Sequence, residues 1–150
     1  MRSERQTAEQ ALIMEINRVG RLYRKGVDRA LAAHGLSSAA ALPVIFIARL
    51  GEGVSQKIVA EHLGIEGPSL ARQLDKLCAA GLVERREDRA DRRMKGLHLS
   101  DSGKSLAASV EAALLDFRGA MLAKIPDADL TTTLRTLEIF AATLEDGDAR

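Results

Sequence analysis

Apolar residues recur at helical spacing through the first third of the chain. Over residues 7–34 they stand three or four positions apart, which predicts a long amphipathic helix that ends at Gly35. A second helix is expected to be capped by Ser37 or Ser38 and to run through Leu50. Because this second segment is apolar on almost every side, we expect it to be buried.

The next segments follow the pattern of a helix-turn-helix. Pro43 is compatible with the second helix if it lies in the first turn, since proline lacks the amide hydrogen that later turns require. Ser55 is placed to cap a third helix, and Gly64 is placed to make a tight turn after it. A helix, a short turn with glycine and a second helix form a known supersecondary motif.

The helix predicted over residues 67–77 has two distinct faces. Leu70, Leu74 and Leu77 form one apolar stripe, and Pro68 at the first helical position suits a helix start. The other face is polar, and it consists of Ser69, Arg72, Gln73 and Lys76. Long side chains with hydrogen-bond donors on one face are what a helix needs to contact phosphates and base edges in a major groove.

A β-hairpin with a charged tip is expected directly after this helix. Gly81 is placed to end the helix, and residues 82–86 and 95–100 are predicted to form the two strands. The arginines at the tip include Arg89, Arg92 and Arg93. Such a tip is compatible with a solvated charged turn and with insertion into a DNA minor groove, where the potential is most negative. The neighbouring polar helix face favours the minor groove.

Several segments of this region resemble one known family. They are Gly64 to Leu77, Gly81-Leu82-Val83, Asp91-Arg92-Arg93-Met94-Lys95 and Leu97-His98-Leu99-Ser100. The chain is similar over nearly its whole length to the multiple-antibiotic-resistance regulator (MarR) family, and most similar to its SlyA branch. The resemblance implies that Asp91 braces Arg93, which enters the minor groove, and that Ser69 and Arg72 face the operator.

The C-terminal segments predict two more helices. Ser100 is expected to cap a fifth helix, which residues 125–127 break. The last helix carries apolar residues at heptad spacing, namely Leu130, Leu134, Leu137, Ala141 and Leu144. A heptad stripe requires a partner helix, either in an intramolecular bundle or in a second copy of the chain. The resemblance implies a homodimer in which the first, fifth and sixth helices of two subunits interlock.

The predicted fold is mainly α, with about six helices and a small β-hairpin wing. Residues 1–150 suit one domain of MarR type. Within it, residues 37–100 would form a winged helix-turn-helix lobe that binds DNA, and residues 5–35 and 101–146 a helical dimerisation region. Aromatic residues make up 3% of the chain and Trp is absent, so the core must be aliphatic, which favours helices.

Composition narrows the class of protein only slightly. A formal net charge of +1 neither supports nor excludes DNA binding, so a DNA-binding surface would depend on local segregation of charge. The longest apolar run, residues 39–48, is far short of the roughly 20 residues that a membrane span needs. No apolar signal core follows the N-terminus, and we therefore expect a cytoplasmic protein.

The sequence offers little for catalysis or metal binding. His34, His62 and His98 lie on separate predicted elements without zinc-ligand spacing, and each is expected to be a surface or cap residue. Phosphate-binding loops, nucleophile elbows and zinc-protease motifs do not occur, so we expect neither an enzyme nor a cofactor. Cys78 has no adjacent base in sequence, which favours a packed side chain over a thiol switch.

These patterns lead to one functional hypothesis and one rival. The hypothesis is a homodimeric transcriptional regulator, a ligand-responsive repressor, that binds a pseudo-palindromic double-stranded DNA operator. The resemblance adds a small-molecule effector, an aromatic or phenolic acid or a related metabolite. The rival is a helical dimer whose winged lobe binds another protein instead of DNA. The predicted DNA-binding residues are Ser55, Gln56, Pro68, Ser69, Arg72, Gln73, Lys76, Arg89, Asp91, Arg92 and Arg93.

Overall fold

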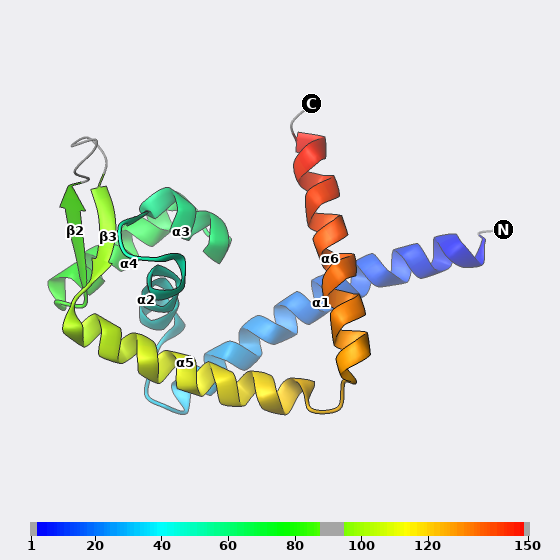
Figure 1. Ribbon diagram of the computed structural model, residues 1–150, viewed down its shortest axis with the longest axis horizontal. Helices are drawn as coiled ribbons and strands as arrows, with labels where there is room; N and C mark the ends of the chain where they lie inside the picture. The colour runs from blue at the N-terminus through cyan, green and yellow to red at the C-terminus, as the bar shows by residue number, and fades with distance from the viewer. Residues whose placement is uncertain (1–2, 88–94, 149–150) are drawn as a thin grey trace. The chain divides into compact units, whose positions relative to one another are not determined.

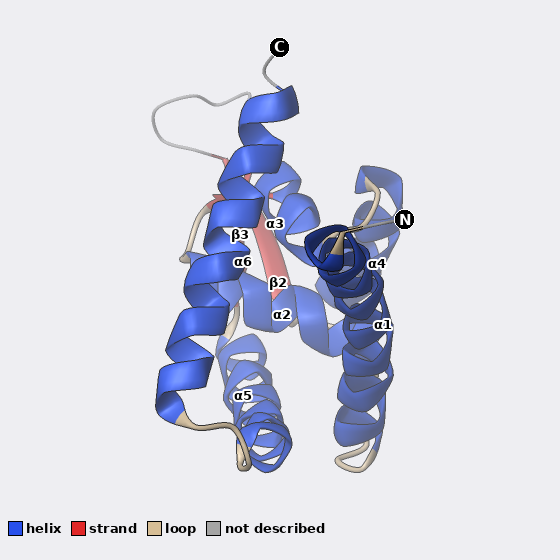
Figure 2. Cartoon of the chain, turned by 90° about the vertical axis from the view of Figure 1, so that its right-hand side faces the viewer, coloured by secondary structure: helices blue, strands red, loops and turns tan. Residues whose placement is uncertain are grey.

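The computed structural model describes residues 3–87 and 95–148, and the chain forms two compact units, Met1–Phe117 and Arg118–Arg150. Helices predominate, and the strands form one small sheet in the first unit (Figure 2). In chain order (Figure 1) the elements are α1 (Glu4–Ala32), α2 (Ser38–Leu50), β1 (Val54–Ser55), α3 (Gln56–Leu63), α4 (Gly67–Ala79), β2 (Val83–Glu87), β3 (Lys95–Leu99), α5 (Asp101–Leu122) and α6 (Asp127–Asp148). This agrees with the predicted class, a mainly α fold with a winged helix-turn-helix.

α1 starts earlier than the apolar spacing predicted, because a capping box fixes its first turn. The Ser3 Oγ accepts a hydrogen bond from the Gln6 amide at 3.2 Å, and the Gln6 side chain accepts one from the Ser3 amide at 3.0 Å. The helix also ends slightly before the predicted residue 34, and Gly35 follows with a φ of +70°. Only glycine adopts such a φ without strain, so the chain turns there.

Pro43 lies deeper in α2 than the sequence suggested. α2 is capped by Ser37, whose Oγ accepts a hydrogen bond from the Ala40 amide at 3.3 Å. The helix therefore begins at Ser38, and Pro43 is its sixth residue, in the second turn. The condition stated for Pro43, a position in the first turn, is therefore not met. Proline withholds the usual helical donor from the Ala39 carbonyl, but its ring is fully buried in the core and gains packing there.

The sheet has three antiparallel strands in the order β1-β3-β2, one strand more than the predicted hairpin. β1 has only two residues and pairs with Leu97 and Gly96 of β3. A side chain at Gly96 would place its Cβ 2.7 Å from the carbonyl oxygen of Gly53. Glycine at this position therefore lets the chain before β1 approach β3, and the Gly53 amide donates a hydrogen bond to the Leu97 carbonyl at 2.8 Å.

One hydrophobic core holds α2, α3, α4 and the sheet together. Among the described residues its largest fully buried side chains are aliphatic, as the low aromatic content predicted: Leu31, Ile47, Leu70, Leu74, Leu97, Val44, Val59, Val83 and Val110. The predicted leucine stripe of the fourth helix is confirmed. Because α4 has only one apolar face, burying that face fixes which of its side chains point outward.

α5 and α6 differ in how far they are buried. Ser100 caps α5 as predicted, since its Oγ accepts a hydrogen bond from the Gly103 amide at 3.0 Å. The first half of α5 has buried residues, whereas none of the side chains described for α6 is buried. Within the described part of the chain, no helix combines the length and the apolar character needed to cross a membrane.

Candidate nucleic-acid interface

The turn between α3 and α4 positions the helix that was predicted to read DNA. The Ser55 Oγ accepts a hydrogen bond from the Ile58 amide at 3.3 Å and so caps α3, as predicted. Gly64 adopts a left-handed conformation with φ +64° and ψ +36°, and this residue ends α3. An open groove contains Gln56 and Lys57 of α3 together with residues 64–67. The start of α3 and the start of α4 therefore lie close together.

α4 presents a polar face beside its buried leucines. Its four predicted contact residues all lie on this face. Arg72 and Lys76 are exposed, whereas Ser69 and Gln73 are half-buried. Neither Arg72 nor Lys76 makes an ion pair with another described residue, so both cations are available to a ligand such as a phosphate. α4 starts at Gly67, which makes Pro68 its second residue instead of its first.

β2 is tied to α4 by Arg85, which lies in the first predicted strand of the hairpin. The Arg85 Nη1 lies 2.8 Å from Asp75 Oδ1, and the same nitrogen is 4.0 Å from the Sγ of Cys78. Cys78 therefore has a basic neighbour that was not apparent in the sequence, because the contact joins a helix to a strand. Arg86 is also paired, with Nη2 2.7 Å from Glu84 Oε2. These two arginines stabilise the wing locally.

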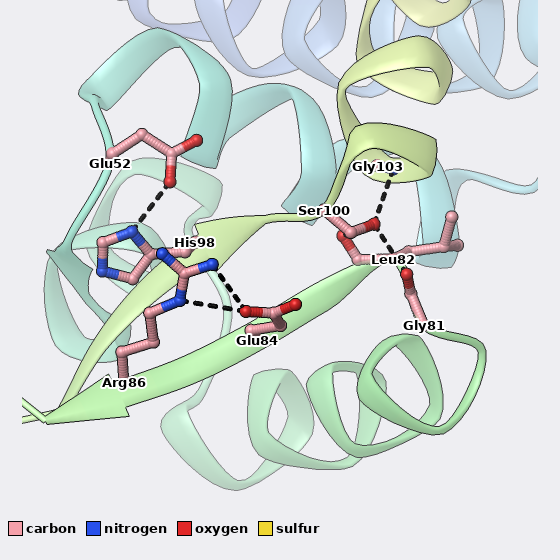
Figure 3. Close-up of polar contacts among 8 residues, drawn as sticks. All are labelled: Glu52, Gly81, Leu82, Glu84, Arg86, His98, Ser100 and Gly103. Carbon is pink, nitrogen blue, oxygen red and sulfur yellow. Dashed lines mark hydrogen bonds and ion pairs between the residues drawn. The ribbon is translucent and has the colours of Figure 1, made fainter.

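A second set of polar contacts fixes the base of the wing (Figure 3). His98 Nδ1 lies 2.9 Å from Glu52 Oε2, and the His98 side chain is only 22% exposed. The Ser100 Oγ donates a hydrogen bond to the Gly81 carbonyl at 2.6 Å, besides capping α5. Both contacts lie near the C-terminal end of β3, where Glu52 holds His98 and the turn after α4 holds Ser100.

Two of the three histidines behave as expected. His34 and His62 each contact the carbonyl four residues earlier, at 3.0 and 2.9 Å, near the end of their helices. His98 differs, because it is mostly buried and pairs with a carboxylate from a distant part of the sequence. The expectation of a plain surface or cap residue was wrong for His98, since β-sheet pairing brings the two segments together.

The arginines at the tip lie outside the described residues. Arg89, Asp91, Arg92 and Arg93 all fall within residues 88–94, so the Asp91–Arg93 brace stays a prediction. The described strands on either side end at the paired residues Glu87 and Lys95. In sequence, the predicted tip therefore follows the last residue of β2 and precedes the first residue of β3.

A cavity of about 410 Å³ lies in the first unit among α1, α2, α3 and α5. Its polar and aromatic lining consists of Tyr23, Arg24, Asp28, Phe46, Arg49 and His62. Arg49 is held by Glu111 of α5, with Nη2 and Nε at 2.7 and 3.1 Å from the same carboxylate oxygen. Its guanidinium carbon also lies 5.9 Å from the centre of the Phe46 ring, within the range of a cation–π contact.

The three-stranded sheet on a helix-turn-helix core defines a winged helix-turn-helix protein. A sequence model of the MarR family matches residues 34–94. The crystal structure of transcriptional regulator PA3341 is 32% identical, covers 90% of this chain and 98% of its own, and superposes with a TM-score of 0.83. The chain belongs to the MarR family of transcriptional regulators, which are not enzymes.

Three further solved structures extend the comparison. CouR from Rhodococcus jostii RHA1, bound to p-coumaroyl-CoA, is 28% identical over 87% of this chain and 91% of its own, with a TM-score of 0.76. The S. aureus MepR–DNA complex is 17% identical over 86% and 93%, with a TM-score of 0.72, and at this identity the likeness is one of fold. A structure of SlyA shares the fold at 15% identity.

Proposed function

We propose that this protein is a cytoplasmic transcriptional regulator that binds a pseudo-palindromic operator as a homodimer and releases it when an effector binds. The observation that carries the proposal is the polar face of α4. Its leucines are fixed in the core, and Arg72 and Lys76 are exposed without ionic partners among the described residues. α4 would lie in the major groove, which admits one helix.

Each predicted contact residue has a role in this proposal. Arg72 and Gln73 would read base edges, and Ser69 and Lys76 would hold phosphates. Ser55 and Gln56 would contact the DNA backbone at the start of α3, near Pro68 at the start of α4. At the tip, Arg93 would probe the minor groove, braced by Asp91 and flanked by Arg89 and Arg92.

The proposed dimer uses residues 5–35 and 101–146, outside the DNA-binding lobe of residues 37–100. α1 exposes large apolar side chains, including Leu12, Ile16 and Val19. α6 exposes another set, including Leu134 and Leu144. A second copy that covers these faces would remove an apolar surface from water. Two-fold symmetry then requires half-sites about one helical turn apart, roughly 34–36 Å.

An effector of aromatic or phenolic acid type, or a related metabolite, suits the cavity among α1, α2, α3 and α5. MarR-family regulators bind small-molecule effectors, and CouR binds p-coumaroyl-CoA. A volume of about 410 Å³ lies within the range of roughly 300–1,000 Å³ that small-molecule sites occupy. Aromatic rings and two guanidinium groups in the lining match an anionic aromatic compound.

The proposal is tested by binding to duplex fragments of the gene's own upstream region over a salt series. We expect a dissociation constant of about 10⁻⁸ to 10⁻¹¹ M and a steep salt slope, because specific complexes release counterions and add base contacts. An unrelated duplex of the same length is the control. Failure of every upstream and random duplex to bind better than this control would contradict the proposal and favour a protein partner for the winged lobe.

The wing is tested separately with Arg93→Ala. We expect weaker operator binding with an unchanged dimer and an unchanged thermal melt, because the side chain is proposed to contact DNA and, within the protein, Asp91 alone. Arg93→Lys is the matched variant, since it keeps the charge but loses the planar guanidinium. Wild-type operator affinity in Arg93→Ala would remove Arg93 from the interface.

A further inference from the structure

We propose that Glu66, at the start of α4, reads a cytosine in each half-site of the operator and weakens binding to DNA that lacks it. This inference rests on the proposed function as an operator-binding regulator, to which it adds an acidic residue that determines base specificity. Unlike Arg72 and Lys76, Glu66 carries a charge of the same sign as the DNA backbone. Its position, its exposure and the charges around it carry the inference.

Glu66 belongs to the first turn of α4, but its side chain does not cap the helix. Its backbone carbonyl accepts hydrogen bonds from the Ser69 and Leu70 amides, at 3.0 and 3.1 Å, whereas its carboxylate accepts none from the helix. Glu66 is exposed and makes no ion pair with another described residue. The carboxylate is therefore available at the end of α4 where recognition helices contact base edges.

The open groove beside Glu66 is acidic. Its charged lining residues are Lys57, Glu61 and Glu66. The Lys57 Nζ lies 4.0 Å from Glu61 Oε1, so these two charges offset each other, and Glu66 leaves the groove with a negative charge. Arg72 and Lys76 give the adjacent polar face of α4 two positive charges. The surface that is proposed to contact DNA thus changes sign between the start of α4 and its middle.

The chemistry of DNA limits what a carboxylate at this position can bind. A phosphate repels it, since the two charges have the same sign. In the major groove, guanine presents only acceptors and thymine presents an acceptor and a methyl group. Adenine has an amino group beside the N7 acceptor, whereas the groove edge of cytosine offers its N4 amino donors alone. The base edge that suits Glu66 is therefore cytosine.

The same charge opposes binding at unrelated sequences. Where the cytosine is missing, the carboxylate loses water near phosphates and gains no hydrogen-bond donor, which costs free energy. Specificity is a difference between affinities, and a repulsive group increases it by weakening the wrong complexes. A formal net charge of +1 fits this arrangement, because general attraction to the DNA backbone adds little discrimination between sequences.

The test is selection of bound duplexes from one random pool by the full-length wild type and its variants, followed by sequencing. Wild type should prefer cytosine at one position in each half-site by about tenfold over the other bases. Glu66→Ala should lose this preference at that position alone. Glu66→Gln should shift it to adenine, since a glutamine amide pairs with both the N6 and N7 atoms of adenine.

Two further variants separate base reading from a structural role. Glu66→Asp introduces a residue that caps helices well, so we expect an equal or higher thermal melt together with a weaker cytosine preference. Glu61→Gln removes a carboxylate from the same groove and is the matched control, which should keep the base preferences of wild type. Both Glu66→Gln and Glu61→Gln should bind an unrelated duplex several-fold more tightly at low salt, because each removes a charge that repels phosphates.

The outcomes distinguish this inference from the proposed function. Wild-type base preferences in Glu66→Ala and Glu66→Gln would overturn the inference, and so would an equal loss of cytosine preference in Glu61→Gln. Unchanged binding of the unrelated duplex by Glu66→Gln would overturn the repulsive role. In each of these cases a wild type that still selects an operator leaves the proposed function intact. A wild type that enriches no sequence from the pool contradicts the proposed function itself.

Discussion

Two helices of this chain carry leucines at the same spacing, yet their environments are opposite. In α4, Leu70, Leu74 and Leu77 are 0–3% exposed, whereas in α6 Leu130, Leu134 and Leu137 are 42–57% exposed. Steps of four and three residues put each set on one stripe of its helix. The pattern therefore predicts that a face will be buried, but not whether the same chain or a second copy covers it.

The largest effect is expected at α4, whose leucines are buried by other residues of the same chain. Leu74→Ala should lower the free energy of unfolding by about 2–5 kcal/mol, because Leu74 is fully buried and the substitution leaves a cavity. Urea denaturation monitored by circular dichroism measures this loss. The loss should be similar at low and high protein concentration, since α4 packs within its own unit. A strong concentration dependence of the loss would contradict the assignment of Leu74 to the core of one chain.

The matching substitution on α6 should act on assembly. We expect Leu134→Glu to weaken the proposed dimer by about 1.5–3 kcal/mol, the value of burying one leucine, or roughly 10- to 100-fold in the dimer dissociation constant. Analytical ultracentrifugation over a dilution series measures the change. Thr132→Glu, on the opposite side of α6, is the control and should leave the dimer intact. Equal effects of the two variants would count against the leucine stripe as the interface.

The polar face of α4 should affect DNA affinity without changing stability. Arg72→Ala is expected to cost about 1–3 kcal/mol of operator binding and to relax the base preference at one position. Lys76→Ala should instead lower the salt slope by about one unit on every duplex, as expected for a phosphate contact. Binding isotherms with operator and unrelated duplexes at several salt concentrations separate these outcomes. A wild-type slope for Lys76→Ala would exclude that contact.

The smallest effect is expected at the link between α4 and the wing. Asp75→Asn removes the charge that pairs with Arg85, but the Asp75 side chain is 66% exposed, so the pair is screened. We expect a loss of unfolding free energy below about 1 kcal/mol, and operator binding that weakens only slightly. Glu84→Gln, which disrupts the Arg86 pair on β2, is the matched control. A large loss of operator affinity in Asp75→Asn alone would mean that this link sets the wing position.

Sequence patterns predicted the helices well because their signals are local. Caps such as Ser37, Ser55 and Ser100 act on residues three positions away, and they occur in the structure where the spacing placed them. The contacts that were missed join residues distant in sequence. Glu52 meets His98, and Arg85 meets Asp75 and Cys78, through the sheet and its packing on α4. No periodic pattern carries such information.

β1 was missed for a different reason. With two residues, it is too short to show the alternation that identifies a strand, and its existence depends on Gly96 in β3. The glycine gave no sign of this role in the sequence, because a glycine in a strand also occurs at bulges.

The candidate DNA-binding face of α4 could be predicted from the sequence more fully than β1. The amphipathic pattern of residues 67–77 fixed its orientation once the leucines were known to be buried.

The most direct test of the account is the mass of the complex between the protein and its operator, measured by sedimentation together with a hydroxyl-radical footprint. We predict two chains of 16.2 kDa on each duplex, with protected half-sites centred about 10–10.5 base pairs apart. This result would place two α4 helices in successive major grooves. One chain on each duplex, or a footprint without two-fold symmetry, would contradict the proposed homodimeric regulator.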